Sequence, residues 1–254
     1  MTEYGRKYPG GFPRGLSQPE TGFRFSADSL LLSCFVKPGH GHKVVDLGCG
    51  CGVIGFGVML ASPEKDIWVT GLDKNPEMID HSVRNAESLG LSSCFQALEM
   101  DLSQVKSTCF KPESYDLAVA NPPYRKPGAG RAPRDKSRLQ ASVGDIDQLE
   151  QFCKAGAFLL KKKGKLGVVF LADRIDELLM IMNRSGLIPK KILPVYGNRT
   201  RPARVILIEA VKNAGPGLTI MPPLFLYDQT NRLTSQALKF CPFLECNPGA
   251  GPGL

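Results

Sequence analysis

Short apolar runs alternate with amphipathic stretches over most of this chain. The runs have the length and the β-branched content of buried strands, and the stretches between them have the helical spacing of apolar positions. The pattern predicts strands over 43–47, 67–73, 93–100, 115–120 and 164–172, with helices over 26–36, 53–61, 76–89, 145–160 and 173–185. Strands that alternate with helices form a parallel sheet, so we predict a Rossmann-like α/β fold with helices on both faces.

The last part of the pattern differs from the rest. Two further strands, over 188–195 and 203–211, follow one another with a short basic link and no helix between them. Strands joined in this way pair antiparallel, so we expect a mostly parallel sheet of seven strands with one antiparallel strand. Residues 1–22 are rich in Gly and Pro, and the chain ends in CNPGAGPGL. We therefore predict a flexible arm over 1–22, one folded domain over 23–236 and a flexible tail over 237–254.

The charge balance points to a polyanionic partner. The chain has 32 Lys and Arg against 24 Asp and Glu, a net charge of +8. Such an excess favours nucleic acid through long-range attraction and counterion release. One basic cluster follows the 115–120 strand and contains a single acid, Asp135; its cations are Arg125, Lys126, Arg131, Arg134, Lys136 and Arg138. A second cluster, Lys161–Lys163 with Lys165, is better explained as a helix end that complements the helix dipole.

Cysteine usage and hydropathy predict a cytoplasmic protein. No apolar run approaches the ~18 residues of a spanning helix, and the N-terminus lacks the apolar core of a signal peptide. The eight cysteines lack the regular spacing of a secreted scaffold, which indicates reduced thiols. The chain has only three histidines to complete a zinc site with the Cys pairs at 49/51 and 241/246, so we predict no metal.

The most distinctive motif is Asn121-Pro122-Pro123-Tyr124, which directly follows the 115–120 strand. Two prolines fix φ at about −65° and lack N–H donors, so the carbonyls here cannot complete a regular ladder. The Asn121 side-chain oxygen and the Pro122 carbonyl can each accept a hydrogen bond from one –NH2 group, and Tyr124 offers a ring for stacking. The motif thus predicts a site that holds a substrate amine. The alternative is a proline-stiffened strand exit with a packed tyrosine.

A glycine loop follows the first strand, in the sequence Asp46-Leu47-Gly48-Cys49-Gly50-Cys51-Gly52. Glycines at alternate positions let the chain turn sharply and let a nucleotide-like cofactor approach the backbone. A carboxylate at the mouth of the loop, Asp46, would repel a pyrophosphate but suits an ammonium group. S-adenosylmethionine carries an ammonium group and no phosphate. A structural cap at the strand end, or a structural ion pair, is the alternative role for Asp46.

Two more acids follow the second and third strands. Asp73 is placed to accept hydrogen bonds from the ribose hydroxyls of such a cofactor, and Asp101 to contact its adenine amine. A helix or turn cap is the alternative for Asp101. The predicted cofactor site comprises Asp46, Gly48, Cys49, Gly50, Gly52, Asp73, Lys74, Asp101 and Asn121.

These motifs, in this order, resemble the class I S-adenosylmethionine-dependent methyltransferases that act on amino groups. The segment FRFSADSLL at 23–31, the basic loop after Tyr124 and residues 223–234 are similar, more specifically, to bacterial tRNA adenine-N6 methyltransferases. That family modifies the purine just 3′ of the anticodon of valine tRNA. The likeness covers about residues 22–236, so it implies that 23–236 is a methyltransferase domain with S-adenosylmethionine as cofactor and tRNA as substrate.

The resemblance also implies residue roles. Asn121 and Pro122 would accept the two N6 hydrogens of the target adenine, and Tyr124 would stack on its ring after the base leaves the anticodon loop. Arg24 and Phe25 would fold over the cofactor or the base, although a hydrophobic staple at the helix start is the alternative. The RNA contacts would come from Arg24, Phe25, Arg125, Lys126, Arg131, Arg134 and Arg138. We expect a monomer or a weak dimer.

Other functions remain open from the sequence. The same Asn-Pro-Pro-Tyr turn occurs in enzymes that methylate a glutamine amide of release factors, and a guanine-N2 rRNA methyltransferase is a further alternative. The glycines at 50, 52 and 55 can also be matched to a dinucleotide fingerprint with Asp73 downstream, which would suit an NAD-dependent oxidoreductase. A catalytically silent RNA-binding subunit is the third class, because a cofactor fold does not prove turnover.

Overall fold

The structure, a computed structural model, describes residues 11–19, 25–108, 110–123 and 137–246, with 137–146 described by their backbone alone. The strands are β1 (Lys43–Leu47), β2 (Trp68–Asp73), β3 (Phe95–Glu99), β4 (Tyr115–Ala120), β5 (Leu160–Leu171), β6 (Leu187–Tyr196), β7 (Val205–Lys212), β8 (Thr219–Ile220) and β9 (Leu224–Phe225). The α-helices are α1 (Ala27–Phe35), α2 (Val53–Leu60), α3 (Pro76–Ser88), α4 (Ser137–Leu159), α5 (Ile175–Arg184) and α6 (Ser235–Phe240).

The described strands form one sheet in the order β3-β2-β1-β4-β5-β7-β6-β8, and β9 also pairs with β6. β7 runs antiparallel to both β5 and β6, while the other pairings are parallel. The predicted mostly parallel sheet with one antiparallel strand is therefore confirmed, and it contains β8 and β9 in addition to the seven predicted strands. β8 and β9 were not predicted, because a two-residue strand is too short to show any alternation of side chains.

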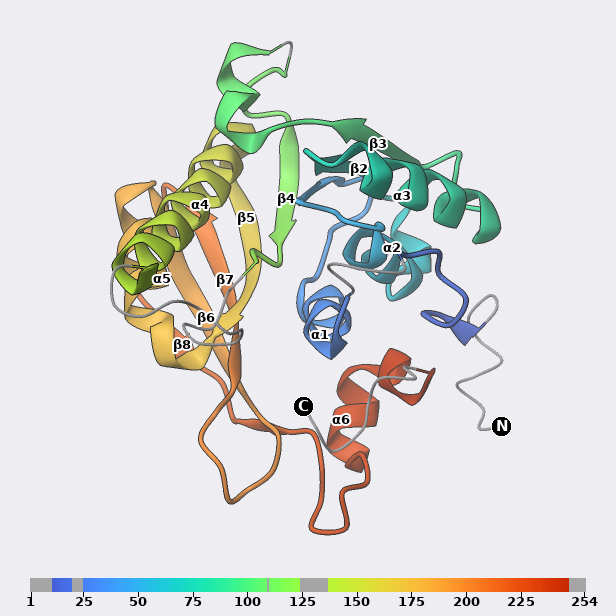
Figure 1. Ribbon diagram of the computed structural model, residues 1–254, viewed down its shortest axis with the longest axis vertical. Coiled ribbons are helices and arrows are strands. Elements are labelled where there is room, and N and C mark those ends of the chain that lie inside the picture. Colours follow the sequence, from blue (N-terminus) through green and yellow to red (C-terminus); the bar gives the residue numbers. More distant parts are fainter. Residues whose placement is uncertain (1–10, 20–24, 109, 124–136, 247–254) are drawn as a thin grey trace.

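Each central strand is buried on both faces. Along β1, Val44 points into the core beneath α1, α2 and α6, whereas Val45 points into the core beneath α4 and α5. Along β4, Val119 and Ala120 divide between the same two cores. Successive side chains of a strand point to opposite faces, so a strand covered on both sides is a continuous apolar run. Figure 1 shows the resulting layers, with α4 and α5 on one side of the sheet and α1 and α2 on the other.

Capping residues fix where two helices of this frame begin. The Ser26 side chain accepts a hydrogen bond from the backbone N–H of Asp28 at the start of α1. Asn75 does the same for Glu77 at the start of α3, where Pro76 occupies the first turn. α4 begins eight residues before its predicted start, at Ser137 rather than residue 145. No helix among the described residues is long and apolar enough to cross a membrane.

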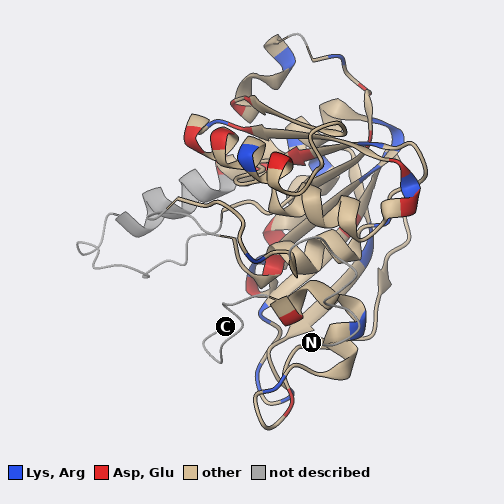
Figure 2. Ribbon diagram, turned by 90° about the vertical axis from the view of Figure 1, so that its right-hand side faces the viewer, with Lys and Arg blue, Asp and Glu red and all other residues tan. Residues whose placement is uncertain are grey.

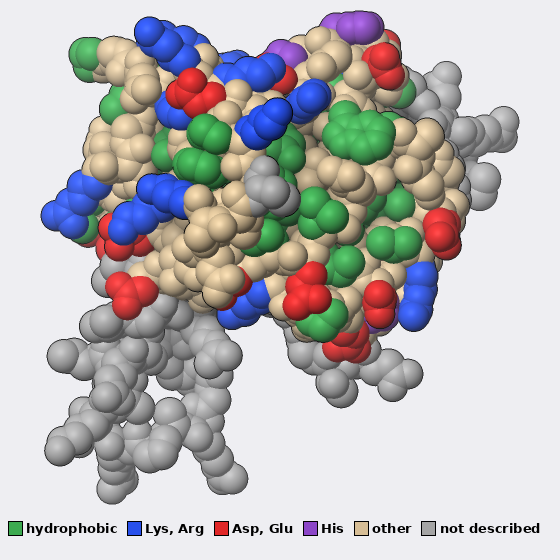
Figure 3. All heavy atoms as spheres, turned by 90° about the horizontal axis from the view of Figure 1, so that it is seen from above, with side chains coloured by type: hydrophobic (Ala, Val, Ile, Leu, Met, Phe, Trp, Pro, Cys, Tyr) green, Lys and Arg blue, Asp and Glu red, His purple; other side chains and the backbone are tan. Residues whose placement is uncertain are grey.

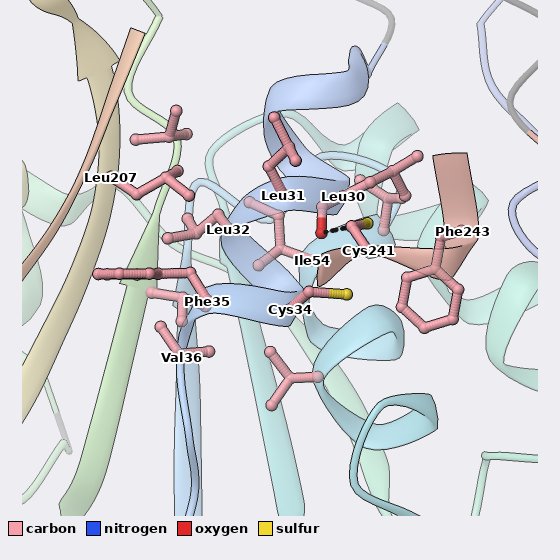
Figure 4. Close-up of a cluster of buried hydrophobic side chains, with 14 of the residues drawn as sticks. Leu30, Leu31, Leu32, Cys34, Phe35, Val36, Ile54, Leu207, Cys241 and Phe243 are labelled. Carbon is pink, nitrogen blue, oxygen red and sulfur yellow. Dashed lines mark hydrogen bonds between the residues drawn. The ribbon is translucent and has the colours of Figure 1, made fainter. Parts of the chain in front are cut away.

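Both ends of the described chain pack onto the domain, unlike the flexible arm and tail expected from composition. Phe12 and Phe243 are almost fully buried, and their rings meet edge to face with centroids 4.9 Å apart. Residues 237–246 include the last four residues of α6, which ends at Phe240, and a 3₁₀ helix at Pro242–Cys246. Cys241 donates a hydrogen bond to the carbonyl of Leu30 in α1 (Figure 4). Glycine and proline content did not reveal these segments as ordered, because a few buried apolar side chains suffice to anchor them.

Candidate active site

The loops after β1, β2, β3 and β4 lie at the carboxyl edge of the sheet and enclose a cavity of about 410 Å³. The cavity is lined by Gly48, Gly50, Leu72, Asp73, Lys74, Asn75, Met78, Met100, Asp101, Leu102, Asn121, Pro123, Gln148, Gln151 and Phe152. A small pocket of about 20 Å³ adjoins it and shares Gly48, Gly50, Met78 and Asn121. Ligands of parallel α/β sheets bind in such a crevice, at the carboxyl ends of the strands.

The glycine loop has the backbone conformation that its sequence predicts. Gly48, Gly50 and Gly52 have φ values of 66°, 53° and 86°, which L side chains rarely adopt. A Cβ on Gly48 would come within 2.9 Å of the Phe152 ring, whereas a Cβ on Gly50 would meet nothing within 4 Å. The space beside Gly50 is therefore open for a ligand to approach the backbone.

Asp73 ties the glycine loop to the end of β2. Its Oδ2 accepts a hydrogen bond from the backbone N–H of Gly50 at 2.9 Å, and its Oδ1 accepts one from Asn75 at 2.9 Å. Each carboxylate oxygen has a second lone pair, so both can still accept a hydroxyl from the cavity. Lys74 lines the same cavity. The ribose contact predicted for Asp73 fits this position and remains a prediction.

Asp46 is placed differently from a residue at the mouth of a loop. It is fully buried within β1, where Oδ2 accepts a hydrogen bond from Gly55 at 3.0 Å and Oδ1 has no partner among the described residues. Burial raises the pKa of this carboxyl to about 7. Asp46 is not among the residues that line either cavity, which matches its alternative role as a structural cap. A carboxyl that is partly protonated at neutral pH repels a pyrophosphate less than a fully ionised one does. The charge of Asp46 therefore discriminates less between the two cofactors than the sequence suggested.

Asp101 and the loop cysteines also have structural contacts. Asp101 lines the larger cavity and caps a 3₁₀ helix over Leu102–Ser107 by accepting a hydrogen bond from Ser103 at 2.9 Å, which lowers its pKa. Cys49 and Cys51 are buried and line the small pocket. Burial raises the pKa of the Cys51 thiol to about 12 and that of Cys49 well above its usual value, so neither is a ready nucleophile.

Asn121 lies where the two cavities meet, directly after β4. Its Nδ2 donates a hydrogen bond to the Oγ of Ser29 at 3.0 Å. Ser29 belongs to α1, is 2% exposed and lines the small pocket. In this orientation the nitrogen end of the Asn121 amide faces α1, and its oxygen end can accept a further hydrogen bond.

Sequence reasoning did not single out several residues of this site. Ser29, Met78, Gln148, Gln151 and Phe152 line the two cavities. The signal for Ser29 was a polar residue within an apolar helical stretch. Gln18 and Pro19 also line the small pocket, and Gln18 accepts a hydrogen bond from the backbone N–H of Phe25 at 3.2 Å. Phe25 lines the same pocket, and its contact with the cofactor or the base remains a prediction.

The remaining predicted residues lie outside the described part of the chain. These are Arg24, Tyr124, Arg125, Lys126, Arg131 and Arg134. Arg138 falls in the first turn of α4, where the backbone alone is described. Pro122 follows Asn121 and is buried, while Pro123 lines the larger cavity.

The second basic cluster lies away from this site, at the amino-terminal edge of β5. Lys161 pairs with Asp116 at 2.6 Å, and Lys163 donates to the carbonyl of Asn213 at 2.9 Å. Lys165 pairs with Glu209 at 3.4 Å. Figure 3 views the molecule from above, onto this edge, where Lys and Arg lie among Asp and Glu side chains. These contacts favour a structural role for the cluster.

Comparison with known proteins agrees with this geometry. The chain matches the family model of the methyltransferase small domain over residues 26–180. It is 25% identical to the tRNA1(Val) (adenine(37)-N6)-methyltransferase of Glaesserella parasuis, over 68% of this chain and 76% of that protein. It is 24% identical to the protein of the same name from Yersinia enterocolitica, over 76% and 74% of the two chains. The crystal structure of a predicted O-methyltransferase from Agrobacterium tumefaciens superposes on this chain with a TM-score of 0.68. The two chains are 19% identical, and the match covers 85% of this chain and 96% of that one.

The fold and the crevice at its carboxyl edge are those of a class I methyltransferase, which depends on S-adenosylmethionine. The chain belongs to the methyltransferase small domain family. The family and the cofactor predicted from the sequence are thereby confirmed, and between the two cofactors considered for the glycine loop the family selects S-adenosylmethionine.

The residues of the larger cavity suit that cofactor. Its volume of about 410 Å³ lies within the range of small-molecule sites. Asp73 lies at one side, and Leu72, Met100, Leu102 and Phe152 offer apolar contacts to a base. Gly50 leaves open space beside the backbone, so a ligand can approach the loop there.

Proposed function

We propose that this protein methylates the exocyclic N6 amine of an adenine in tRNA, with S-adenosylmethionine as methyl donor. The observation that carries the proposal is the position of Asn121, which borders both cavities and has its amide nitrogen bound to Ser29. The similarity to tRNA1(Val) (adenine(37)-N6)-methyltransferases over about three quarters of the chain supports the choice of substrate. The net charge of +8 suits a nucleic acid.

The proposed role of Asn121 follows from the direction of its amide. Because Nδ2 donates to Ser29, Oδ1 is the atom that can accept a hydrogen from a substrate amine. The Pro122 carbonyl would accept the other hydrogen, since none of the described strands pairs with the backbone there. Two acceptors draw the nitrogen lone pair out of conjugation with the ring and stabilise the positive charge that develops on nitrogen as it attacks.

Positioning supplies most of the remaining catalysis. S-adenosylmethionine provides a methyl group on a sulfonium, which is already electrophilic. The residues of this chain therefore need to bind both partners and align the attacking nitrogen about 3 Å from the carbon that it attacks. Asp73 would hold the ribose, and the small pocket formed by Phe25, Ser29 and Ile54 would confine the end of the cofactor nearest Asn121. No strong base is required, because the proton can leave after the new bond has formed.

Two related substrates offer the same –NH2 chemistry. A release-factor glutamine amide and the N2 amine of guanine could also be held by Asn121 and Pro122. Each of the three substrates would give a different methylated product, so the decisive experiment is to identify the product directly. Labelled S-adenosylmethionine is incubated with the protein and total bacterial tRNA, and the tRNA is then digested to nucleosides.

We expect label in N6-methyladenosine. Label in N2-methylguanosine, or in a release factor offered in parallel and not in tRNA, would refute the adenine assignment. An Asn121→Ala protein serves as the control for contaminating activity, because it lacks the proposed acceptor and keeps the cavity residues of the glycine loop.

A further inference from the structure

Two loops that no site described above includes lie side by side at the carboxyl edge of the sheet. The first joins β6 to β7 over residues 197–204, and the second follows β9 over residues 226–234. The backbone N–H of Leu226 donates to the carbonyl of Tyr196, and that of Tyr227 donates to the carbonyl of Gly197, both at 2.9 Å. The two loops therefore meet where they leave the sheet.

This surface is on the same edge as Asn121. β6 and β5 are both antiparallel to β7, and β5 is parallel to β4, so β6 and β4 run in the same direction. β6 thus ends at the edge where β4 leads into Asn121. Three strand spacings separate β4 from β6 in the sheet order, a distance of about 14 Å. A nucleic acid bound at Asn121 can reach the surface with a few nucleotides of its backbone.

The two loops carry an excess of positive charge. Their arginines are Arg199, Arg201, Arg204 and Arg232, hereafter the arginine surface, and their single acid is Asp228. The Asp228 side chain caps the turn that follows it, because its Oδ1 accepts hydrogen bonds from the backbone N–H groups of Thr230 and Arg232. Figure 2 shows Lys and Arg on these loops at its lower end.

The arginines differ in their contacts from four lysines of β5, β6 and β7. Across the described residues, no member of the arginine surface takes part in a salt bridge, whereas Lys161, Lys165, Lys191 and Lys212 all do. Arg199, Arg201 and Arg232 are exposed. Their charges are thus available to an anionic partner.

Aromatic rings hold part of this surface in place. The Arg199 guanidinium lies over the Phe225 ring, 4.6 Å from its centroid, and the Tyr196 and Phe225 rings lie 5.2 Å apart. The preceding turn is fixed by Asn198, whose Oδ1 accepts from both the N–H and the hydroxyl of Thr200. A guanidinium held on a ring loses less conformational entropy when it binds a phosphate than a free side chain does.

We propose that the arginine surface binds the phosphate backbone of the RNA substrate next to the nucleotide that enters the catalytic cavity. The inference rests on the proposed function and adds to it a binding surface formed by the β6–β7 loop and residues 226–234. Arginine presents a planar fork of donors that matches phosphate oxygens, and within the described part of the chain none of these four arginines forms a salt bridge with a carboxylate. A protein partner would need apolar anchors, and none of the exposed large apolar side chains of the described chain lies in either loop.

The test compares two double variants that remove the same charge. Arg199→Gln with Arg201→Gln alters the arginine surface. Lys111→Gln with Lys162→Gln removes two exposed cations from the opposite edge, before β4 and within the first residues of β5. For both proteins and the wild type, tRNA affinity is measured as a function of salt concentration, and methyl transfer is followed at limiting and saturating tRNA. Thermal melts check that the variants are folded.

Each phosphate contact contributes about 0.7–0.9 to the slope of log affinity against log salt. The arginine variant should therefore lose about 1.4–1.8 from this slope and show a higher KM for tRNA, with kcat at saturating tRNA unchanged. The lysine variant should keep the wild-type slope. Equal slopes for the two variants would overturn the inference about the arginine surface. The proposed function would still stand in that case, provided that the wild-type protein methylates tRNA. Absence of methyl transfer to tRNA by the wild type would instead refute the proposed function.

Discussion

The hydrogen bond between Ser29 and Asn121 can be removed without touching either proposed acceptor of the substrate amine. In Ser29→Ala, the Asn121 Nδ2 loses its acceptor at 3.0 Å and faces a buried methyl group. The amide can then turn so that its NH2 group points into the cavity, where water is available. In that orientation it presents a donor to the substrate amine, which is the wrong end of the group.

The size of the effect follows from the cost of an unpaired donor. A buried donor without a partner costs about 1–3 kcal/mol. If that energy favours the turned amide, the fraction of molecules with the Asn121 Oδ1 facing the substrate amine falls about 5-fold to 150-fold. The value of kcat then falls by the same factor. Affinity for S-adenosylmethionine should stay near that of the wild type, because the cofactor contacts proposed for Asp73 are unchanged.

A matched control lies one turn further along α1. Ser33 is also buried, at 1% exposed, but its hydroxyl donates to the carbonyl of Leu30 within the same helix. Ser33→Ala therefore deletes the same atom from the same helix without affecting Asn121. Single-turnover methyl transfer, calorimetry with S-adenosylmethionine and thermal melts are recorded for both variants. A Ser29→Ala rate within about twofold of the Ser33→Ala rate would refute the proposed orientation of the amide.

Three further substitutions test other parts of the site. Asn121→Ala should lower turnover at least about a hundredfold with little change in cofactor affinity, because it removes a contact made in the transition state, and near-normal turnover would exclude the mechanism. Asp73→Ala should weaken S-adenosylmethionine binding about tenfold or more in calorimetry, since a charged acceptor is lost together with the anchor of Gly50; an unchanged affinity would remove Asp73 from the cofactor site. Asp46→Asn should abolish a pH dependence of stability. The folded chain holds the Asp46 proton to about pH 7 and the unfolded chain releases it near pH 3.8, so the wild-type free energy of unfolding should fall as pH rises, by about 3 kcal/mol between pH 5 and pH 8. Urea denaturation at both pH values measures this, and the same pH dependence in wild type and variant would contradict the raised pKa.

The amino-acid sequence determined the elements and their order. Apolar runs gave the strands of the central sheet, and Ser26 and Asn75 gave the starts of two helices, because caps and periodicity act between neighbours in the chain. The same local logic placed the glycine loop, Asp73 and Asn121 at the carboxyl edge, since parallel strands bring the residues that follow them together.

The tertiary structure decided what each polar group contacts. Ser29 and Asn121 are 92 residues apart in the chain, and nothing in either segment shows that they meet. Asp46 follows the pattern of a cofactor-binding acid, yet its burial and its bond to Gly55 make it a structural carboxyl with a raised pKa. The packing of Phe243 against Phe12 likewise converts an expected tail into part of the core. Such contacts depend on how distant elements pack, and a periodic pattern records only which positions are apolar.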